Sequence, residues 1–119
     1  MKKIFLTTSI GYSYKHSLPP LGLICIGTYI KHSKDCEVLV LDAYKKRTSP
    51  EEYKQMLREF NPHAVGISCH AEDRIFGIKT AQYSKQACPQ VPVIMGGPYP
   101  AICDEEIIAK VPEVDFVVR

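Results

Sequence analysis

No stretch of this chain of 119 residues approaches a membrane-spanning segment. A helix needs about 20 consecutive apolar residues to cross a bilayer, and the apolar runs here are far shorter. The basic start at Lys2 and Lys3 leads into only Ile4–Leu6 before hydroxyl residues begin, which is too short for a secretory signal. We therefore expect a cytoplasmic protein with no membrane partner.

A strong charge of either sign is also missing. The formal net charge is +2, and residues 45–47 form the one tight basic cluster. A nucleic-acid surface usually needs a broader basic patch, so we expect no nucleic-acid partner and interpret the cluster as a solvated loop. Hydrophobic residues make up 45% and charged residues 24%, close to globular averages, and the length suits one domain over residues 1–119.

Paired cysteines are absent. The number of cysteines is odd, and no Cys-x-x-Cys or zinc-type spacing occurs, so neither a disulfide framework nor a zinc site is indicated. We expect reduced, mostly buried thiols at Cys25, Cys36, Cys69, Cys88 and Cys103.

The common phosphate-binding motifs are missing as well. Neither a Gly-x-Gly-x-x-Gly fingerprint nor a Walker-type Gly-Lys-Ser/Thr loop is present. A response-regulator receiver is disfavoured, because Ser68, Cys69 and His70 stand where its acceptor aspartate would follow the third strand.

What the chain does have is a regular alternation of short apolar runs and longer helical patterns. Runs of consecutive apolar residues are typical of parallel strands that are covered on both faces. The patterns predict strands at 2–8, 36–42, 64–68, 91–95 and 115–118, and helices at 21–30, 50–60, 73–87 and 104–110. We expect the first helix to be largely buried, because its residues are mainly apolar.

Three helix starts carry specific signals. Ser49 precedes Pro50, and Glu52 completes a capping box, so a helix should begin at residue 50. Asp73 can cap the helix that follows the third strand. The acidic residues at 104–106 would lie near the positive end of the short helix predicted there.

This alternation predicts an α/β fold with right-handed crossovers. Five strands of this length suit a flavodoxin-like or Rossmann-like three-layer sandwich, with a five-stranded parallel sheet in the order 2-1-3-4-5. No helix pattern follows the last strand. We therefore expect the chain to be the N-terminal part of a longer protein.

In such a fold, ligands bind at the carboxyl ends of the strands. There the fourth strand ends in Gly96 and Gly97, which would let a ligand approach the backbone closely, although an ordinary turn would explain them too. We expect bulk at this pair to abolish binding without unfolding the sheet. His70 is the histidine best placed for ligand contact, whereas surface positions are expected for His16, His32 and His63.

Two other chemistries are possible at this edge. The hydroxyl-rich segment 7–13 has the composition of an FMN phosphate loop, but its spacing is off by one residue and Pro19 and Pro20 intervene before the helix. Cys69 and Cys103 lie near the same edge, yet no base stands at a spacing that would make either one a catalytic thiol.

Several stretches keep a fixed order along nearly the whole chain. They are Leu18-Pro-Pro-Leu-Gly-Leu-Ile24 with Tyr29 and Ile30, Val38-Leu-Val-Leu-Asp42, Pro62-His-Ala-Val-Gly-Ile-Ser68, Asp73-Arg74, Val93-Ile-Met-Gly-Gly-Pro98 and Val114-Asp-Phe-Val-Val-Arg119. Together they resemble the amino-terminal cobalamin-binding domain of cobalamin-dependent radical S-adenosylmethionine enzymes.

The resemblance implies a domain that holds cobalamin with its corrin across the carboxyl ends of the strands and its nucleotide tail beside the sheet. Ser68 would contact the tail, and Gly96 and Gly97 would let it pass, because a flat group beside a strand end needs positions without a Cβ. The implied cofactor-binding residues are Thr8, Ser9, Tyr12, Pro20, Leu21, Gly22, Asp42, Ser68, Cys69, His70, Gly96, Gly97, Pro98 and Tyr99.

Two departures qualify the resemblance. The Asp-x-His-x-x-Gly motif that supplies an axial histidine in classical cobalamin enzymes is missing, so no cobalt ligand is predicted. The Cys-x-x-x-Cys-x-x-Cys motif of a radical enzyme is missing too, which puts S-adenosylmethionine and a [4Fe-4S] cluster in a C-terminal radical domain beyond Arg119. We expect no catalytic residue and no metal ligand in this chain, and no catalysis by it alone.

Three functions follow as hypotheses. The first is a cobalamin-binding domain that presents its cofactor for methyl transfer or a related radical reaction. The second is an FMN-binding flavodoxin-like oxidoreductase that uses the hydroxyl-rich segment. The third is a flavodoxin-like docking domain without a cofactor.

Overall fold

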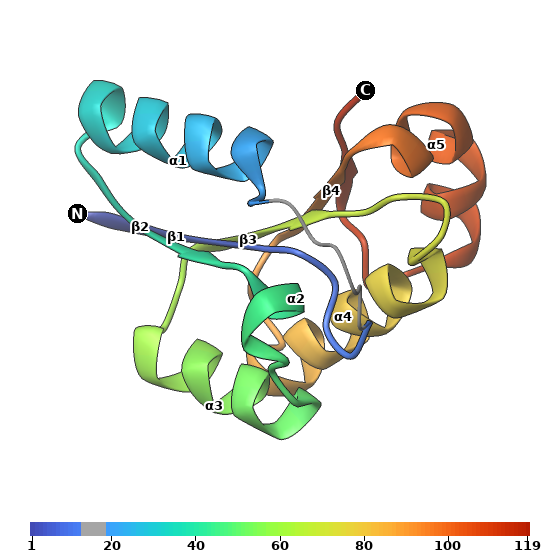
Figure 1. The fold of residues 1–119 in the computed structure, drawn as a ribbon, viewed down its shortest axis with the longest axis horizontal. Helices are drawn as coiled ribbons and strands as arrows, with labels where there is room; N and C mark the ends of the chain where they lie inside the picture. Colours follow the sequence, from blue (N-terminus) through green and yellow to red (C-terminus); the bar gives the residue numbers. More distant parts are fainter. Residues whose placement is uncertain (13–18) are drawn as a thin grey trace.

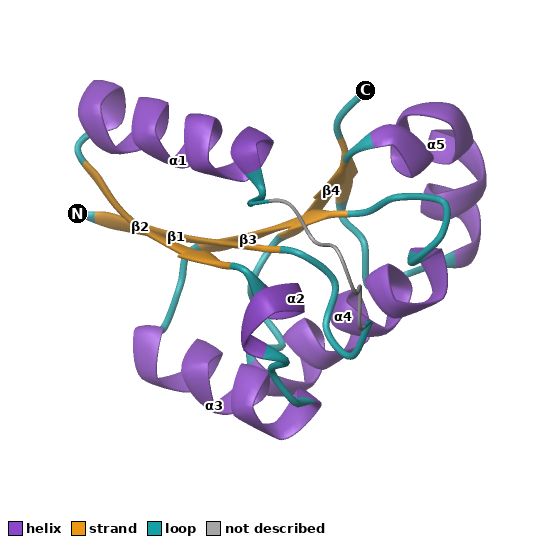
Figure 2. Ribbon diagram, viewed as in Figure 1, coloured by secondary structure: helices purple, strands orange, loops and turns teal. Residues whose placement is uncertain are grey.

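A computed structural model describes residues 1–12 and 19–119 of the chain. One parallel sheet of five strands has the order β2-β1-β3-β4-β5, with helices on both sides, and confirms the flavodoxin-like α/β fold (Figures 1 and 2). The strands are β1 (Lys2–Thr7), β2 (Cys36–Leu41), β3 (Ala64–Ser68), β4 (Val93–Gly96) and β5 (Phe116–Val117). Of the positions considered above, Ser13, His16 and Leu18 lie outside the described residues.

The helices divide unequally between the two faces of the sheet. They are α1 (Leu21–Lys34), α2 (Ala43–Lys46), α3 (Pro50–Phe60), α4 (Arg74–Ala87) and α5 (Pro98–Lys110). In Figure 1, α1 lies above the sheet, whereas α3 and α4 lie below it. Ile107 of α5 belongs to the same buried core as Tyr53 and Leu57 of α3 and Ala81 of α4. The sheet therefore has one face with several helices and one face with α1.

Burial follows this division. The side chains of Val65, Ile67, Val93 and Met95, which face α3, α4 and α5, are at most 2% exposed. Their neighbours along β3 and β4 alternate with them and are half-buried. Each fully buried apolar side chain contributes about 1.5–3 kcal/mol relative to leaving it in water. The core that stabilises the fold therefore lies on the side of α3, α4 and α5.

Helix α1 is less buried than its apolar sequence predicts. Gly27 brings the helix close to the sheet, because a Cβ there would lie 3.1 Å from Val40 and 3.2 Å from Val38. Within the helix, however, only Leu23 and Gly27 are buried. The expectation of a largely buried helix is wrong, since the described residues include no second helix on this face to cover the outward side chains of Leu21, Ile24, Ile26 and Tyr29.

The starts of the other helices test the capping predictions. At α3 the capping box is confirmed: the Ser49 hydroxyl accepts from the Glu52 amide at 3.1 Å, and the Glu52 carboxylate accepts from the Ser49 amide at 3.2 Å. Helix α2 was not predicted. It is a single short turn that the Asp42 side chain caps by accepting from the Lys45 amide at 3.3 Å.

Helix α5 begins earlier than predicted, at Pro98 rather than near residue 104. Proline suits the first turn of a helix, and the backbone leaves helical geometry only at Cys103, where the two parts of α5 meet at a kink. The second part of α5 begins just after Cys103, so the acidic residues 104–106 lie at the start of that part, as the sequence predicts. No helix in residues 1–12 or 19–119 is both long and apolar enough to cross a membrane.

Candidate functional site

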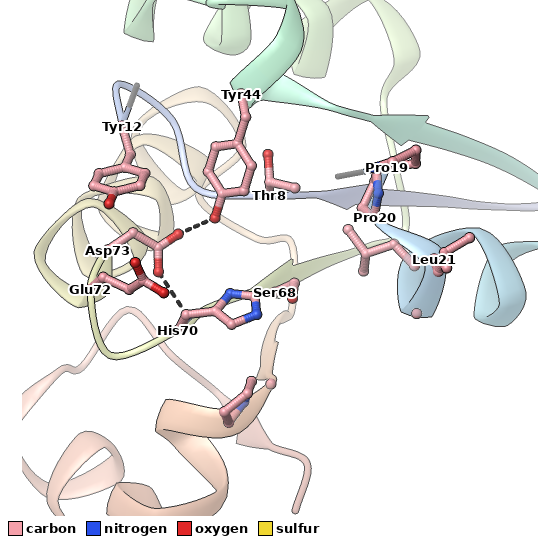
Figure 3. Close-up of a pocket in the computed structure, with 14 residues that line it drawn as sticks. Thr8, Tyr12, Pro19, Pro20, Leu21, Tyr44, Ser68, His70, Glu72 and Asp73 are labelled. Carbon is pink, nitrogen blue, oxygen red and sulfur yellow. Dashed lines mark hydrogen bonds between the residues drawn. The ribbon is translucent and has the colours of Figure 1, made fainter. Parts of the chain in front are cut away.

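A cavity of about 500 Å³ opens at the carboxyl ends of the strands. The loops after β1, β3 and β4 and the first turn of α1 meet there, as the sheet topology predicts for a ligand site (Figure 3). The cavity is lined by Thr8, Tyr12, Pro19, Pro20, Leu21, Gly22, Leu23, Tyr44, Ser68, His70, Glu72, Asp73, Gly97 and Pro98.

The carboxylate of Asp73 organises one wall of this cavity. Asp73 is only 1% exposed, and its carboxylate accepts from the Ser9 hydroxyl at 2.6 Å. It also accepts from the Tyr44 hydroxyl and from the His70 amide, the latter at 2.7 Å (Figure 3). Hydrogen bonds to a charged group are about twice as strong as neutral ones. One buried side chain thus connects the loops after β1 and β3 with helix α2.

Asp73 stands at the helix start that the sequence predicts, but its carboxylate makes no hydrogen bond to the first turn of α4. Its hydroxyl partners Ser9 and Tyr44 are 64 and 29 residues away along the chain. The local sequence therefore predicts a helix cap at Asp73 and does not predict its hydrogen bonds with Ser9 and Tyr44.

Burial controls the protonation of two groups beside Asp73. It raises the pKa of the Tyr44 hydroxyl well above its usual value, and the hydrogen bond to Asp73 adds to the effect. Burial, with a further contribution from the Asp73 charge, raises the pKa of the Cys69 thiol to about 12. Both groups are therefore protonated at neutral pH, Tyr44 as a donor to Asp73 and Cys69 as an unreactive thiol.

His70 is exposed, unlike the buried Cys69 before it. In Figure 3 the imidazole projects into the cavity towards Ser68. In the part of the chain that the structure describes, the ring makes no hydrogen bond, while the backbone amide is held by Asp73. The imidazole is therefore available to a ligand in the cavity.

The hydroxyl groups after β1 are already engaged within the protein. Thr7, Thr8 and Ser9 are at most 3% exposed. The Thr7 hydroxyl donates to the Thr8 carbonyl at 2.8 Å, the Thr8 hydroxyl accepts from the Ala43 amide at 3.0 Å, and Ser9 donates to Asp73. These three hydroxyls do not form an open phosphate-binding loop, which argues against the FMN hypothesis.

The structure brings most of the predicted cofactor-binding residues to one cavity. Those that line it are Thr8, Tyr12, Pro20, Leu21, Gly22, Ser68, His70, Gly97 and Pro98. The others lie behind or beside this lining: Ser9 and Cys69 are fully buried, Asp42 caps α2, and Gly96 and Tyr99 are half-buried at the end of β4 and the start of α5. The lining residues that were not among the predicted cofactor-binding residues are Pro19, Leu23, Tyr44, Glu72 and Asp73.

The two adjacent glycines have different surroundings. Gly97 has a φ of +109°, and a Cβ there would lie 2.6 Å from the backbone oxygen of Cys69. At Gly96 the nearest atom to an added Cβ is the Cβ of Val118, at 3.9 Å. The expectation that bulk is tolerated by the fold at both positions is wrong for Gly97, because the end of β3 already occupies that space.

The sequence profile of the B12 binding domain matches residues 8–119. The chain belongs to the B12-binding domain family. An uncharacterized methyltransferase of Pyrococcus horikoshii is 27% identical over 101 residues, which are 85% of this chain and 22% of that protein. An anaerobic magnesium-protoporphyrin IX monomethyl ester cyclase of Synechocystis is 26% identical over 107 residues, which are 88% of this chain and 21% of that protein. The chain thus spans about a fifth of the length of these relatives.

The residues around the cavity of this B12-binding domain fit a cobalamin. Gly22 lines the cavity, and a Cβ added there would meet no atom within 4 Å. Tyr12 and Tyr44 form an aromatic wall, with ring centroids 5.8 Å apart. A flat macrocycle needs a broad apolar surface and close approach to the backbone, and both are present here.

Proposed function

We propose that this domain holds cobalamin with the corrin over the cavity and the nucleotide tail beside β3 and β4. The observation that carries the proposal is the space at Gly22 and Gly96. The fold has room for a Cβ at both positions, so packing within the protein does not explain the glycines. A ligand that lies against the backbone at both places does explain them.

The path proposed for the tail runs along the face of the sheet that carries α1. Gly66, Ser68 and Gly96 are half-buried on this face, and neither glycine has a side chain that would obstruct a flat group. The Ser68 hydroxyl has no hydrogen-bond partner among the described residues, so it is available to donate to the tail. Gly66 also avoids a clash with Leu6, because the Leu6 Cδ2 would lie 2.7 Å from a Cβ added at Gly66.

We further propose that the domain is the N-terminal part of a radical S-adenosylmethionine enzyme. Two relatives of greater length support this proposal, one named as a methyltransferase and one as a cyclase. Bound cobalamin would supply the methyl-transfer or related radical chemistry, and a following domain would hold S-adenosylmethionine and a [4Fe-4S] cluster. The residues of this chain would bind and orient the cofactor and exclude water from it.

Cofactor retention tests the first proposal. The protein is mixed with hydroxocobalamin or FMN and desalted, and its absorbance spectrum is recorded. We expect corrin bands and no flavin bands, with retention reduced at least about tenfold in Gly96→Val, which corresponds to a loss of about 1.4 kcal/mol. Ala109→Val, which adds bulk at an exposed position of α5, is the matched control and should retain cobalamin fully.

Other outcomes would contradict the proposal. Retained flavin would favour an oxidoreductase, and the absence of any chromophore would favour a docking domain. For the parent enzyme, the test is the coding sequence of the intact gene downstream of residue 119. A Cys-x-x-x-Cys-x-x-Cys motif there is expected, and its absence from the whole protein would refute the assignment to a radical enzyme.

A further inference from the structure

One imidazole in the cavity has no role within the fold. The His70 ring is exposed to the cavity and forms no hydrogen bond in the described part of the chain (Figure 3). Its main chain is nevertheless fixed, because the His70 amide donates at 2.7 Å to Asp73, which is 1% exposed. The backbone of His70 is thus held in place, while its imidazole forms no hydrogen bond within the described residues. A side chain positioned in this way is suited to bind a ligand.

The other side chains around the cavity that could contact a metal are hydrogen-bonded within the protein, buried behind the lining, or weaker metal ligands. The Tyr44 hydroxyl donates to Asp73, the Thr8 hydroxyl accepts from the Ala43 amide, and the Cys69 sulfur is buried behind the lining. Glu72 lines the cavity with an exposed carboxylate. Neutral imidazole is the commonest metal ligand that proteins use, so His70 is the strongest candidate to contact a metal here.

The other described histidines lie elsewhere. His63 precedes β3, and its Nδ1 accepts from the Lys3 amide at 3.0 Å. His32 lies in the last turn of α1, whereas the cavity borders the first turn of that helix. The described histidine that lines the cavity is therefore His70.

We propose that the His70 imidazole is the lower axial ligand of cobalt in the bound cobalamin. The inference rests on the proposed function and extends it. It departs from the expectation of no metal ligand in this chain, because His70 reaches the cavity although the Asp-x-His-x-x-Gly motif is missing. The lone pair of one neutral ring nitrogen would take the place of the dimethylbenzimidazole or water below cobalt. Binding would break no covalent bond of the protein. Asp73 would act as a positioning residue, because it accepts the hydrogen bond from the His70 amide.

Electron paramagnetic resonance tests this ligand directly. The 119-residue chain is loaded with hydroxocobalamin, desalted, and reduced to the cobalt(II) state with a titanium(III) salt. An axial ¹⁴N nucleus splits each cobalt line into a triplet, and an axial ¹⁵N nucleus splits it into a doublet. We expect a triplet in unlabelled protein and a doublet in protein whose histidines carry ¹⁵N, because the nitrogen comes from the chain and not from the cofactor.

Variants identify the histidine. His70→Ala should lose the splitting while it still retains cobalamin, because the tail contacts are unchanged. His32→Ala is the matched control and should keep the splitting, as should His16→Ala. Circular dichroism of each variant verifies the fold, and the labelling result stands even if His70→Ala folds poorly.

The outcomes separate the two proposals. Retained cobalamin with unsplit lines, or a triplet that ¹⁵N-histidine does not change, would overturn the assignment of His70 and leave cobalamin binding intact. Loss of the splitting in His16→Ala in place of His70→Ala would also overturn it. No retained corrin in the wild-type protein would overturn both the ligand assignment and the proposed function.

Discussion

Replacing Gly97 with alanine should destabilise this fold strongly, whereas the same replacement at Gly96 should not. At Gly97 the backbone φ of +109° is a conformation that residues with a Cβ rarely adopt, at a cost of about 1–3 kcal/mol. The new Cβ would also lie 2.6 Å from the oxygen and 3.0 Å from the nitrogen of Cys69. These are backbone atoms of a buried segment, so relieving the overlap costs roughly a further 1–3 kcal/mol.

The sum for Gly97→Ala is about 2–6 kcal/mol, a large part of the roughly 5–15 kcal/mol that stabilises a typical domain. For Gly96→Ala the nearest atom is 3.9 Å away, in ordinary contact, and the change should stay within about 0.5 kcal/mol. Urea denaturation followed by circular dichroism measures both values. Equal stability of the two variants, or a Gly97→Ala protein as stable as wild type, would refute this assignment of roles.

Three further predictions concern the stability of the fold. Gly77→Ala should destabilise by about 1–3 kcal/mol, because its Cβ would overlap the Cys69 sulfur, and the loss measured by urea denaturation should shrink in a Cys69→Ala background. Ser49→Ala should cost about 1 kcal/mol through loss of the capping box, measured in the same way, and a Ser49→Asp variant that keeps its stability is the control. Hydrogen bonds from Lys85 and from the backbone lower the pKa of Asp115, so its stabilisation is present above the unfolded pKa of about 3.9 and is lost as pH falls. Asp115→Asn should therefore lower the urea midpoint at pH 7, and the difference from wild type should vanish at about pH 2.

The sheet order and most element positions follow from local sequence, and the structure shows why. The apolar run of β3 and the capping box at Ser49 are signals contained within a few residues. Each fixes one element, and the right-handed crossover rule then leaves few ways to order five parallel strands. The family resemblance added the cofactor, which neither composition nor periodicity specifies.

The features that local sequence did not predict depend on distant contacts. Local sequence predicts only a cap at Asp73, because its partners Ser9 and Tyr44 come close only in the folded chain. Helix α2 is too short for a periodic pattern, although its turn places Tyr44 in the cavity wall. The start of α5 was missed because Pro98 and Pro100 resemble a loop, whereas proline in a first helical turn is well tolerated.

The unequal faces of the sheet connect the stability of this domain with its proposed function. The side chains that pack against α3, α4 and α5 are fully buried, with Phe5, Val65, Val93 and Met95 all at 0% exposure, so this core is closed without a ligand. On that other face, the half-buried positions of β3 and β4 include two glycines, Gly66 and Gly96. A flat cofactor tail that covered them would bury apolar surface, and this burial is worth about 25 cal/mol per Å². Because the core is already closed without the tail, this free energy would strengthen cofactor binding. A domain built in this way can be stable without its cofactor and still bind the cofactor closely along the backbone.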